Sequence, residues 1–187
     1  MGMPPPTEAN HVIFEHIVDG LLRALRPLLS PAGEAKLREL GLDPNGKLNP
    51  AYPAQVWASA VKICAADAFP GLSPLEGQRQ VAVRTVDVFT GGMLGTAMFS
   101  LLRLLGPDRT IGRMTRNLRS GSNYVETRST QIEPHHYEIW INDVSGVPGF
   151  YKGMLERGLD LVGAQGIRIE LAEQVEPACT YRVSWQG

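Results

Sequence analysis

The residues best suited to metal or acid–base chemistry are four histidines, which form two close pairs in the sequence. His11 and His16 stand five positions apart in a predicted helix, a spacing that turns them to different faces. His135 and His136 are adjacent near the start of a predicted strand, so their side chains diverge. A metal site needs convergent ligands, and neither pair has a carboxylate or thiolate at ligand spacing. The pattern therefore predicts surface or turn histidines and no metal.

The two cysteines, Cys64 and Cys179, lie far apart in the sequence, and both fall on apolar faces. This spacing is typical of free, buried thiols in a reducing compartment, which favours a cytoplasmic location. The sequence contains no nucleophile elbow, zinc-protease motif or phosphate-binding loop. We therefore expect no catalytic residues and a protein that is not an enzyme. An enzyme would need an acid and a base that only the fold brings together.

Three glycines, Gly91, Gly92 and Gly95, interrupt a predicted helix. Glycine inside a helix costs about 1 kcal/mol relative to alanine, so this cluster needs a compensating gain. One interpretation is tight packing of the helix on its neighbours. The other is the floor of an apolar pocket, edged by Phe89, Met93, Met98 and Phe99. The sequence leaves both open.

Arginine is concentrated in one part of the chain. Between residues 103 and 128 there are six arginines and two acidic residues. Arg109, Arg113 and Arg116 fall on one face of a helix predicted for residues 108–119. This face is either a solvated surface or a docking strip for an acidic protein partner or a nucleotide-like ligand, because arginine binds carboxylate and phosphate with two hydrogen bonds. Nucleic acid is not expected, since exposed aromatic residues are not interleaved with the arginines.

Hydrophobic spacing and turn residues predict a helical first half and a second half of mixed period. Predicted helices cover residues 14–28, 31–41, 53–69, 74–105 and 108–119, and the longest should bend or break at its glycines. A ββαββ order follows, with strands at 124–131, 136–142, 167–171 and 179–185 around a helix at 150–162. The predicted fold class is α+β, with an N-terminal helical block packed on a four-stranded antiparallel sheet.

Length and composition are those of a single globular domain. The chain has 187 residues, of which 43% are hydrophobic and 20% charged, enough to bury a core. We expect residues 8–187 to form one domain and residues 1–7 to be a disordered N-terminal segment. The net charge of −1 gives no general attraction to nucleic acid. The uncharged run from Val88 to Leu102 has fifteen residues, too few to span a membrane.

Several segments resemble a paralogous family of unknown function that is abundant in myxobacteria. They occur in the expected order over most of the chain: Leu40-Gly-Leu-Asp43, Pro50-Ala-Tyr-Pro53 with Trp57, Leu104-Leu-Gly-Pro107, Gly121-Ser-Asn-Tyr124, Gly149-Phe-Tyr-Lys-Gly153 and Tyr181-Arg-Val-Ser-Trp185. This resemblance implies a family and no activity.

The order of elements also resembles a wider superfamily that includes haem nitric-oxide sensor domains, four-vinyl-reductase domains and trafficking-complex subunits. That resemblance implies an apolar pocket between helices and sheet, and often dimerisation. The haem branch carries a Tyr-x-Ser-x-Arg motif, whereas this chain has Tyr124-x-Glu126-x-Arg128 and no histidine between residues 81 and 105. The reductase branch often has a cysteine pair in its last hairpin, and here only Cys179 is present. We therefore expect no cofactor, haem included.

Two functional hypotheses follow. The first is a non-enzymatic regulatory or sensor domain that binds a small apolar or amphipathic molecule between helices and sheet, and forms a homodimer. Its expected ligand-binding residues are Trp57, Phe89, Met93, Phe99, Tyr124 and Phe150. The alternative is a protein–protein interaction module, a dimerising adaptor without a ligand that uses the face formed by Arg109, Arg113 and Arg116.

Overall fold

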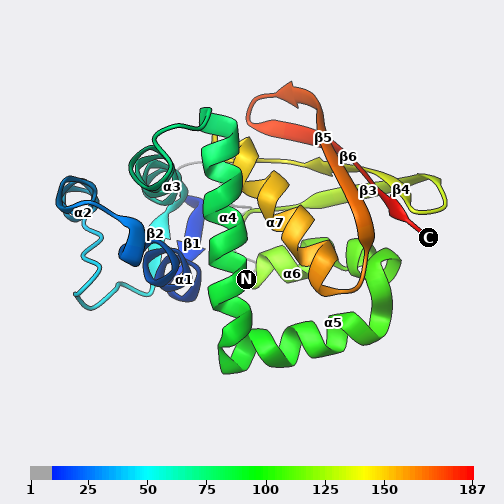
Figure 1. Cartoon of the computed structure of the whole chain (residues 1–187), viewed down its shortest axis with the longest axis horizontal. Helices are drawn as coiled ribbons and strands as arrows, with labels where there is room; N and C mark the ends of the chain where they lie inside the picture. Colours follow the sequence, from blue (N-terminus) through cyan, green and yellow to red (C-terminus); the bar gives the residue numbers. More distant parts are fainter. Residues whose placement is uncertain (1–9) are drawn as a thin grey trace, which may run out of the picture.

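Helices pack against one face of a four-stranded antiparallel sheet in the computed structural model, which describes residues 10–187 (Figure 1). The segment expected to be disordered, residues 1–7, lies outside the described residues. Helices α1, α3 and α4 stand side by side, and α7 lies between α4 and the sheet, as Figure 1 shows. The α+β class and the ββαββ order of the second half are confirmed.

The helices begin where the sequence places capping residues. Ser30 and Ser73 accept hydrogen bonds from the backbone N–H groups of Gly33 and Glu76, and each is followed by proline at the first helical position. Two predicted helix starts are thereby confirmed. The helices are α1 (Glu15–Leu25), continued by a 3-10 turn (Arg26–Leu28), α2 (Pro31–Glu39), α3 (Ala54–Ala68), α4 (Pro74–Gly91), α5 (Met93–Gly112), α6 (Met114–Arg119) and α7 (Pro148–Leu161).

The main sheet has the strand order β3-β4-β6-β5. Its strands are β3 (Thr127–Glu133), β4 (His136–Ile141), β5 (Gln165–Val175) and β6 (Ala178–Gln186). Buried and less buried residues alternate along β4 and β6, so one face of these central strands is covered by helices. Ile139 of β4 lies opposite Tyr181 of β6, and both are fully buried. The strand predicted for residues 179–185 is therefore confirmed.

A second, two-stranded sheet was not predicted. It pairs β1 (Val12–Phe14) with β2 (Ala51–Pro53), two three-residue segments nearly forty residues apart. Ile13 lies opposite Tyr52, and Ile13 also forms a bridge to Ser122. Segments this short carry no readable alternation, which is why the sequence pattern did not show them.

The long helical stretch predicted for residues 74–105 is broken at Gly92, where α4 and α5 meet at 101°. A Cβ atom at Gly95 would lie 2.0 Å from the carbonyl oxygen of Phe89, so the bend requires glycine there. The glycine cluster therefore serves a sharp turn of the backbone, and the predicted break is confirmed. Because of this turn, α5 runs away from α4 and crosses the end of α7 (Figure 1).

The helix predicted for residues 108–119 does not form as one piece. Residues 107–112 end α5 after a kink at Gly106, whose φ of 75° is left-handed. Arg113 then leaves the helical conformation with φ −105° and ψ 5°, and α6 begins at Met114. The three arginines that were expected on one helix face therefore belong to two helices and the joint between them.

Two glycines let the backbones of α4 and α7 touch. A Cβ atom at Gly149 would lie 2.1 Å from the carbonyl oxygen of Leu75, and one at Gly153 would lie 2.3 Å from that of Arg79. The buried amide oxygen of Gln78 accepts a hydrogen bond of 3.0 Å from the backbone N–H of Gly149 at the start of α7. These contacts fix α7 on α4 in register.

An ion-pair network closes the same contact at the surface. The guanidinium of Arg79 on α4 binds Glu76 on its own helix at 2.7 Å and Glu156 on α7 at 2.8 Å. The hydrogen bonds that its guanidinium donates to Glu76 and Glu156 raise the pKa of Arg79. Arg157 of α7 reaches back to Asp87 of α4 with an N–O distance of 2.6 Å. The two helices are therefore joined by close backbone packing and by charge.

Among the described residues, no single helix is long and apolar enough to cross a membrane. The bent pair of α4 and α5 satisfies the length and composition criteria only when the two are counted together.

Both cysteines are buried, and burial makes them poor acids. Loss of solvent raises the pKa of Cys64 from 9.0 to about 12, with a smaller increase from the charge of Asp67. Burial likewise raises the pKa of Cys179 to about 11. The thiolate is the nucleophile in cysteine chemistry, so neither thiol is reactive in the folded chain near neutral pH.

We expect iodoacetamide at pH 9 to leave both cysteines unmodified in the folded chain and to modify both after unfolding in guanidinium. The pKa of Cys64 is higher in the folded chain than in the unfolded chain. The contribution of its protonated thiol to the stability of the fold is therefore complete below pH 9 and is lost as pH rises toward 12. The free energy of unfolding should fall by about 1.4 kcal/mol per pH unit from this group over that window. Urea denaturation at a series of pH values measures the slope, and Cys64→Ala should reduce it. Rapid labelling of the folded chain would contradict the assignment.

Candidate functional site

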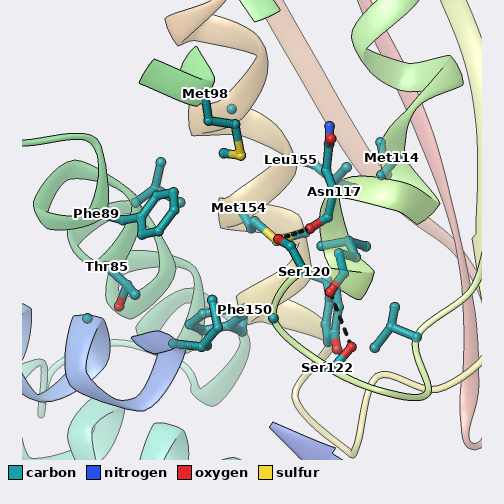
Figure 2. Close-up of a pocket in the computed structure, with 18 of the residues that line it drawn as sticks. Thr85, Phe89, Met98, Met114, Asn117, Ser120, Ser122, Phe150, Met154 and Leu155 are labelled. Atoms are coloured by element: carbon teal, nitrogen blue, oxygen red, sulfur yellow. Dashed lines mark hydrogen bonds between the residues drawn. The ribbon is translucent and has the colours of Figure 1, made fainter. Parts of the chain in front are cut away.

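A cavity of about 200 Å³ lies among α1, α4, α5, α6 and α7. Figure 2 shows Phe89 and Met98 on one side of this space and Asn117, Ser120 and Ser122 on the other. The 101° turn between α4 and α5 produces it, because α5 runs past the end of α7 instead of continuing along α4. The cavity is therefore a consequence of the glycine bend at residues 91–95.

The wall of the cavity is almost entirely apolar. Helix α7 contributes Phe150, Met154, Leu155, Gly158 and Leu159, while the bent pair contributes Val86, Phe89, Met98, Phe99 and Leu102. Trp57 of α3 meets Phe150 edge to face, with ring centroids 4.8 Å apart and planes at 83°. Such a surface favours a molecule that is itself largely apolar.

The hydroxyl groups of the wall donate their protons to backbone carbonyl groups. Ser120 donates to the carbonyl oxygen of Asn117 at 2.6 Å, and Ser122 donates to that of Leu118 at 3.2 Å, the two dashed lines in Figure 2. Thr85 and Thr110 make the same kind of bond to the carbonyl oxygens four residues earlier, each at 2.8 Å. Because their protons are already donated, these hydroxyl groups can only accept hydrogen bonds from a molecule in the cavity.

Besides the indole of Trp57, whose Nε1 is buried without an acceptor, two polar side chains of the wall are unpaired within the described part of the chain. The imidazole of His16 on α1 and the amide of Asn117 on α6 both line the cavity and have no hydrogen-bond partner among the described residues. Neither was predicted to bind a ligand, and His16 was expected to be a surface or turn histidine. Their segments are far apart along the chain, and no spacing rule connects a histidine of the first helix with an asparagine a hundred residues later.

Four of the six predicted ligand-binding residues line the cavity: Trp57, Phe89, Phe99 and Phe150. Met93 does not, because the turn at Gly92 places it on the outer side of α5 with 91% of its side chain exposed. Tyr124 is buried but does not line the cavity. Whether the four contact a ligand stays a prediction.

Tyr124 belongs to a polar cluster that ties the first strand to the loop after β4. Its ring stacks on His11 with centroids 4.3 Å apart, and its hydroxyl lies 2.9 Å from that of Ser145. Asp143 accepts hydrogen bonds from the backbone N–H of Ser145 at 2.6 Å and from Nδ1 of His11 at 3.0 Å. The serine hydroxyl meets the carboxylate and not the imidazole, so the cluster is not arranged as a nucleophile with its base.

The three arginines of the predicted docking strip are exposed. Arg109, Arg113 and Arg116 have no ion-pair partner within the described residues. Their role in binding an acidic partner stays a prediction, as does the homodimer. Across residues 10–187 apart from the side chains of residues 94 and 115, no group of three or more histidine, cysteine, aspartate or glutamate residues converges on a point that could hold a metal ion.

A family model described as a protein of unknown function, DUF2378, matches residues 11–186. The chain belongs to this family. The family resemblance expected from the sequence is confirmed, and the match covers the whole of the fold described above. No curated protein matches the DUF2378 chain in sequence.

Solved structures similar to the DUF2378 chain are H-NOX domains. A Cs H-NOX mutant carrying 4-cyano-L-phenylalanine has a TM-score of 0.71 at 13% identity, over 94% of this chain and 97% of that one. An oxygen-binding H-NOX domain related to soluble guanylate cyclases, solved as its oxygen complex, has a TM-score of 0.67 at 13% identity, over 91% and 94%. The DUF2378 chain therefore has an H-NOX-like fold, as the wider resemblance implied.

This likeness corrects the expectation that the DUF2378 chain binds no cofactor, haem included. A third similar structure, at TM-score 0.68 and 12% identity over 91% of this chain and 94% of that one, is described by heme redox potential and porphyrin distortion. The expectation rested on the absence of a histidine between residues 81 and 105, whereas His16 lines the cavity from α1. It also rested on Glu126 in place of the serine of the haem motif, whereas Glu126 is paired with Arg119 and does not line the cavity.

Proposed function

We propose that the chain is a sensor-type domain whose ligand is a small, largely apolar molecule bound in the cavity between α1, α4, α5, α6 and α7. The observation that carries this proposal is the cavity itself, about 200 Å³ in volume and walled by aromatic, methionine and leucine side chains. The H-NOX-like fold supports it, since an oxygen-binding H-NOX domain has the same arrangement of elements. Protein interiors are normally close-packed, so a space of this size in a core needs an explanation.

The size of the cavity limits the ligand. An apolar cavity of about 150 Å³ binds benzene. The present cavity, at about 200 Å³, therefore accommodates one ring with a short substituent, or an aliphatic chain of similar volume. A larger ligand requires α5 to move outward. Solvent borders the outer side of this helix, where Leu101 and Leu104 are exposed, so no other element has to move with it.

The His16 imidazole is the nitrogen donor that the described part of the wall offers to a metal-bearing ligand. A haem, with its four pyrrole rings, is larger than this cavity and would require α5 to move outward; when bound, it would supply redox and gas-binding chemistry. The residues of this chain would supply the apolar walls that exclude water and the unpaired polar groups of His16 and Asn117.

Native mass spectrometry of the purified chain, compared with its denatured mass, tests the proposal. We expect an excess mass per subunit that solvent extraction releases, and an absorbance spectrum of the same sample shows whether it is a porphyrin. An empty chain is then heated with a size-graded series of apolar probes. Because a ligand that binds only the folded chain stabilises it by RT ln(1 + [L]/Kd), small rings should raise Tm. No retained mass together with no rise in Tm for any probe would overturn the proposal. The subunit count from the same spectrum tests the homodimer.

A further inference from the structure

The outer side of α5 exposes a row of apolar side chains. Met93, Leu101 and Leu104 are 91%, 54% and 84% exposed. Ala97 and Ser100 stand between them at helical spacing and are exposed as well. We call these five residues the α5 stripe. Single exposed leucines are common on protein surfaces, whereas a continuous apolar row on one helix marks a surface that contacts a protein or a membrane.

The region around the stripe is positively charged. Between residues 88 and 125 the chain has five arginines, one aspartate and no other charged residue, hence a net charge of +4, whereas the whole chain carries −1. The aspartate, Asp108, accepts a hydrogen bond from the hydroxyl of Tyr137. One arginine, Arg119, pairs with Glu126. The other four have no ion-pair partner among the described residues: Arg103, Arg109, Arg113 and Arg116.

Arg103 borders the α5 stripe. Its Nε donates a hydrogen bond of 3.1 Å to the backbone carbonyl of Leu161, a neutral group, so its positive charge is not neutralised. The acidic side chains of the neighbouring helices are themselves paired, since Asp87 of α4 and Asp160 of α7 both bind Arg157. An exposed apolar face with uncompensated arginines beside it is the pattern of a helix that lies in the interface of a membrane.

Charge and shape decide which surface fits the stripe. A second copy docked through the same stripe would bring two groups of unpaired arginines together, and like charges oppose such a contact. A leaflet that contains anionic lipid supplies negative headgroups for the arginines and acyl chains for the apolar residues. A protein partner would need a surface shaped to the protruding side chains. A lipid surface needs no such match, and α5 lies at the edge of the molecule (Figure 1).

We propose that the α5 stripe binds the surface of a bilayer that contains anionic lipid. Met93, Leu101 and Leu104 enter the acyl-chain boundary, and Arg103 contacts the headgroups. The helix lies along the surface and does not cross it. This proposal goes beyond the cavity, because it concerns the outer side of α5 and requires no ligand on the inner side.

Co-sedimentation of the full chain with lipid vesicles tests the proposal. One set of vesicles contains equal parts of phosphatidylcholine and phosphatidylglycerol, and the other contains phosphatidylcholine alone. We expect the chain to sediment with the anionic vesicles and to stay in the supernatant with the neutral ones. Added salt should weaken the binding, and Arg103→Gln should weaken it about 5-fold, the contribution of one arginine at an anionic surface. Equal binding to both kinds of vesicle would contradict the proposal.

Leu104→Glu tests the apolar part of the contact. It should lower the partition into anionic vesicles by about 10-fold or more, because it removes a buried apolar side chain from the bound state and adds a repelled charge. Leu72→Glu is the matched control. Leu72 is an exposed leucine just before α4, at the opposite end of that helix from α5, so the same substitution there should leave the partition unchanged.

The outcomes are distinct. Failure of the wild-type chain to sediment with anionic vesicles would overturn the proposal, and so would equal losses for Leu104→Glu and Leu72→Glu. Sedimentation velocity without vesicles identifies the alternative. A dimer that Leu104→Glu dissociates, in a chain that does not bind vesicles, would assign the stripe to a second copy. Thermal unfolding shows whether each variant folds, and Met93→Glu replaces Leu104→Glu if that variant does not.

Discussion

Gly153→Ala should destabilise the chain by about 3 kcal/mol. The added Cβ would lie 2.3 Å from the carbonyl oxygen of Arg79 and 3.0 Å from the Cβ of Ala82, both on α4. The closer atom belongs to the backbone of a helix, so it cannot rotate away as a side chain would. Relief requires α7 to separate from α4, which weakens the hydrogen bond from Gly149 to Gln78 and the ion pairs of Arg79 and Arg157.

The same helix provides the control. Gly158 lies in α7 five positions further on, and a Cβ there would meet nothing within 4 Å. Gly158→Ala should therefore stabilise the chain by up to about 1 kcal/mol, the helix propensity difference between the two residues. Urea denaturation with an unchanged m-value measures both changes in the free energy of unfolding. Equal effects of the two substitutions would show that the helices are not in backbone contact at Gly153.

Gly158→Leu should abolish most of the binding of small apolar rings without destabilising the chain. Gly158 lines the cavity, and the space beside it is open, so a leucine side chain there occupies volume that a ligand would use. We expect the affinity for acetophenone to fall by about 10- to 100-fold, since the ligand and the added side chain compete for one space. Burial of the leucine against Phe89 and Leu155 should keep Tm at or above the wild-type value.

Gly91→Leu distinguishes loss of space from a general effect of a larger residue. Gly91 also has nothing within 4 Å of its added Cβ, but it is exposed at the end of α4 and does not line the cavity. This substitution should leave the affinity for the probe unchanged. If Gly158→Leu binds acetophenone as tightly as the wild-type chain, the probe does not occupy this cavity.

Local signals in the sequence were sufficient for most of the secondary structure. The caps at Ser30 and Ser73 and the alternation from Cys179 to Trp185 act over a few residues, and each predicts its element correctly. The pairing of β1 with β2 was missed because it joins segments nearly forty residues apart that are too short to show a period. The split helix at Arg113 was missed although Gly112 precedes it, because a single glycine inside a helical pattern is tolerated and does not by itself indicate a break.

The candidate site was partly predictable, and the limits have a physical cause. Phe89 and Phe99 were named because aromatic residues beside the glycine cluster indicated a pocket, and both line it. Met93 was named on the same ground and is exposed, because the direction of the turn at Gly92 decides which side of α5 faces inward. His16 and Asn117 enter the site through packing of α1 and α6, which no local pattern encodes.

The two sides of the cavity differ in mechanical stiffness. The side formed by α4 and α7 is stiff, because Gly149 and Gly153 leave no slack between the two backbones and Arg79 and Arg157 bridge them. The side formed by α5 is compliant. That helix is attached through the turn at Gly92 and the kink at Gly106, and its outer residue Leu104 is 84% exposed. A bound molecule larger than the cavity is therefore expected to displace α5 and to leave α4 and α7 in place. The position of the outer surface of α5 would then depend on the size of the bound molecule.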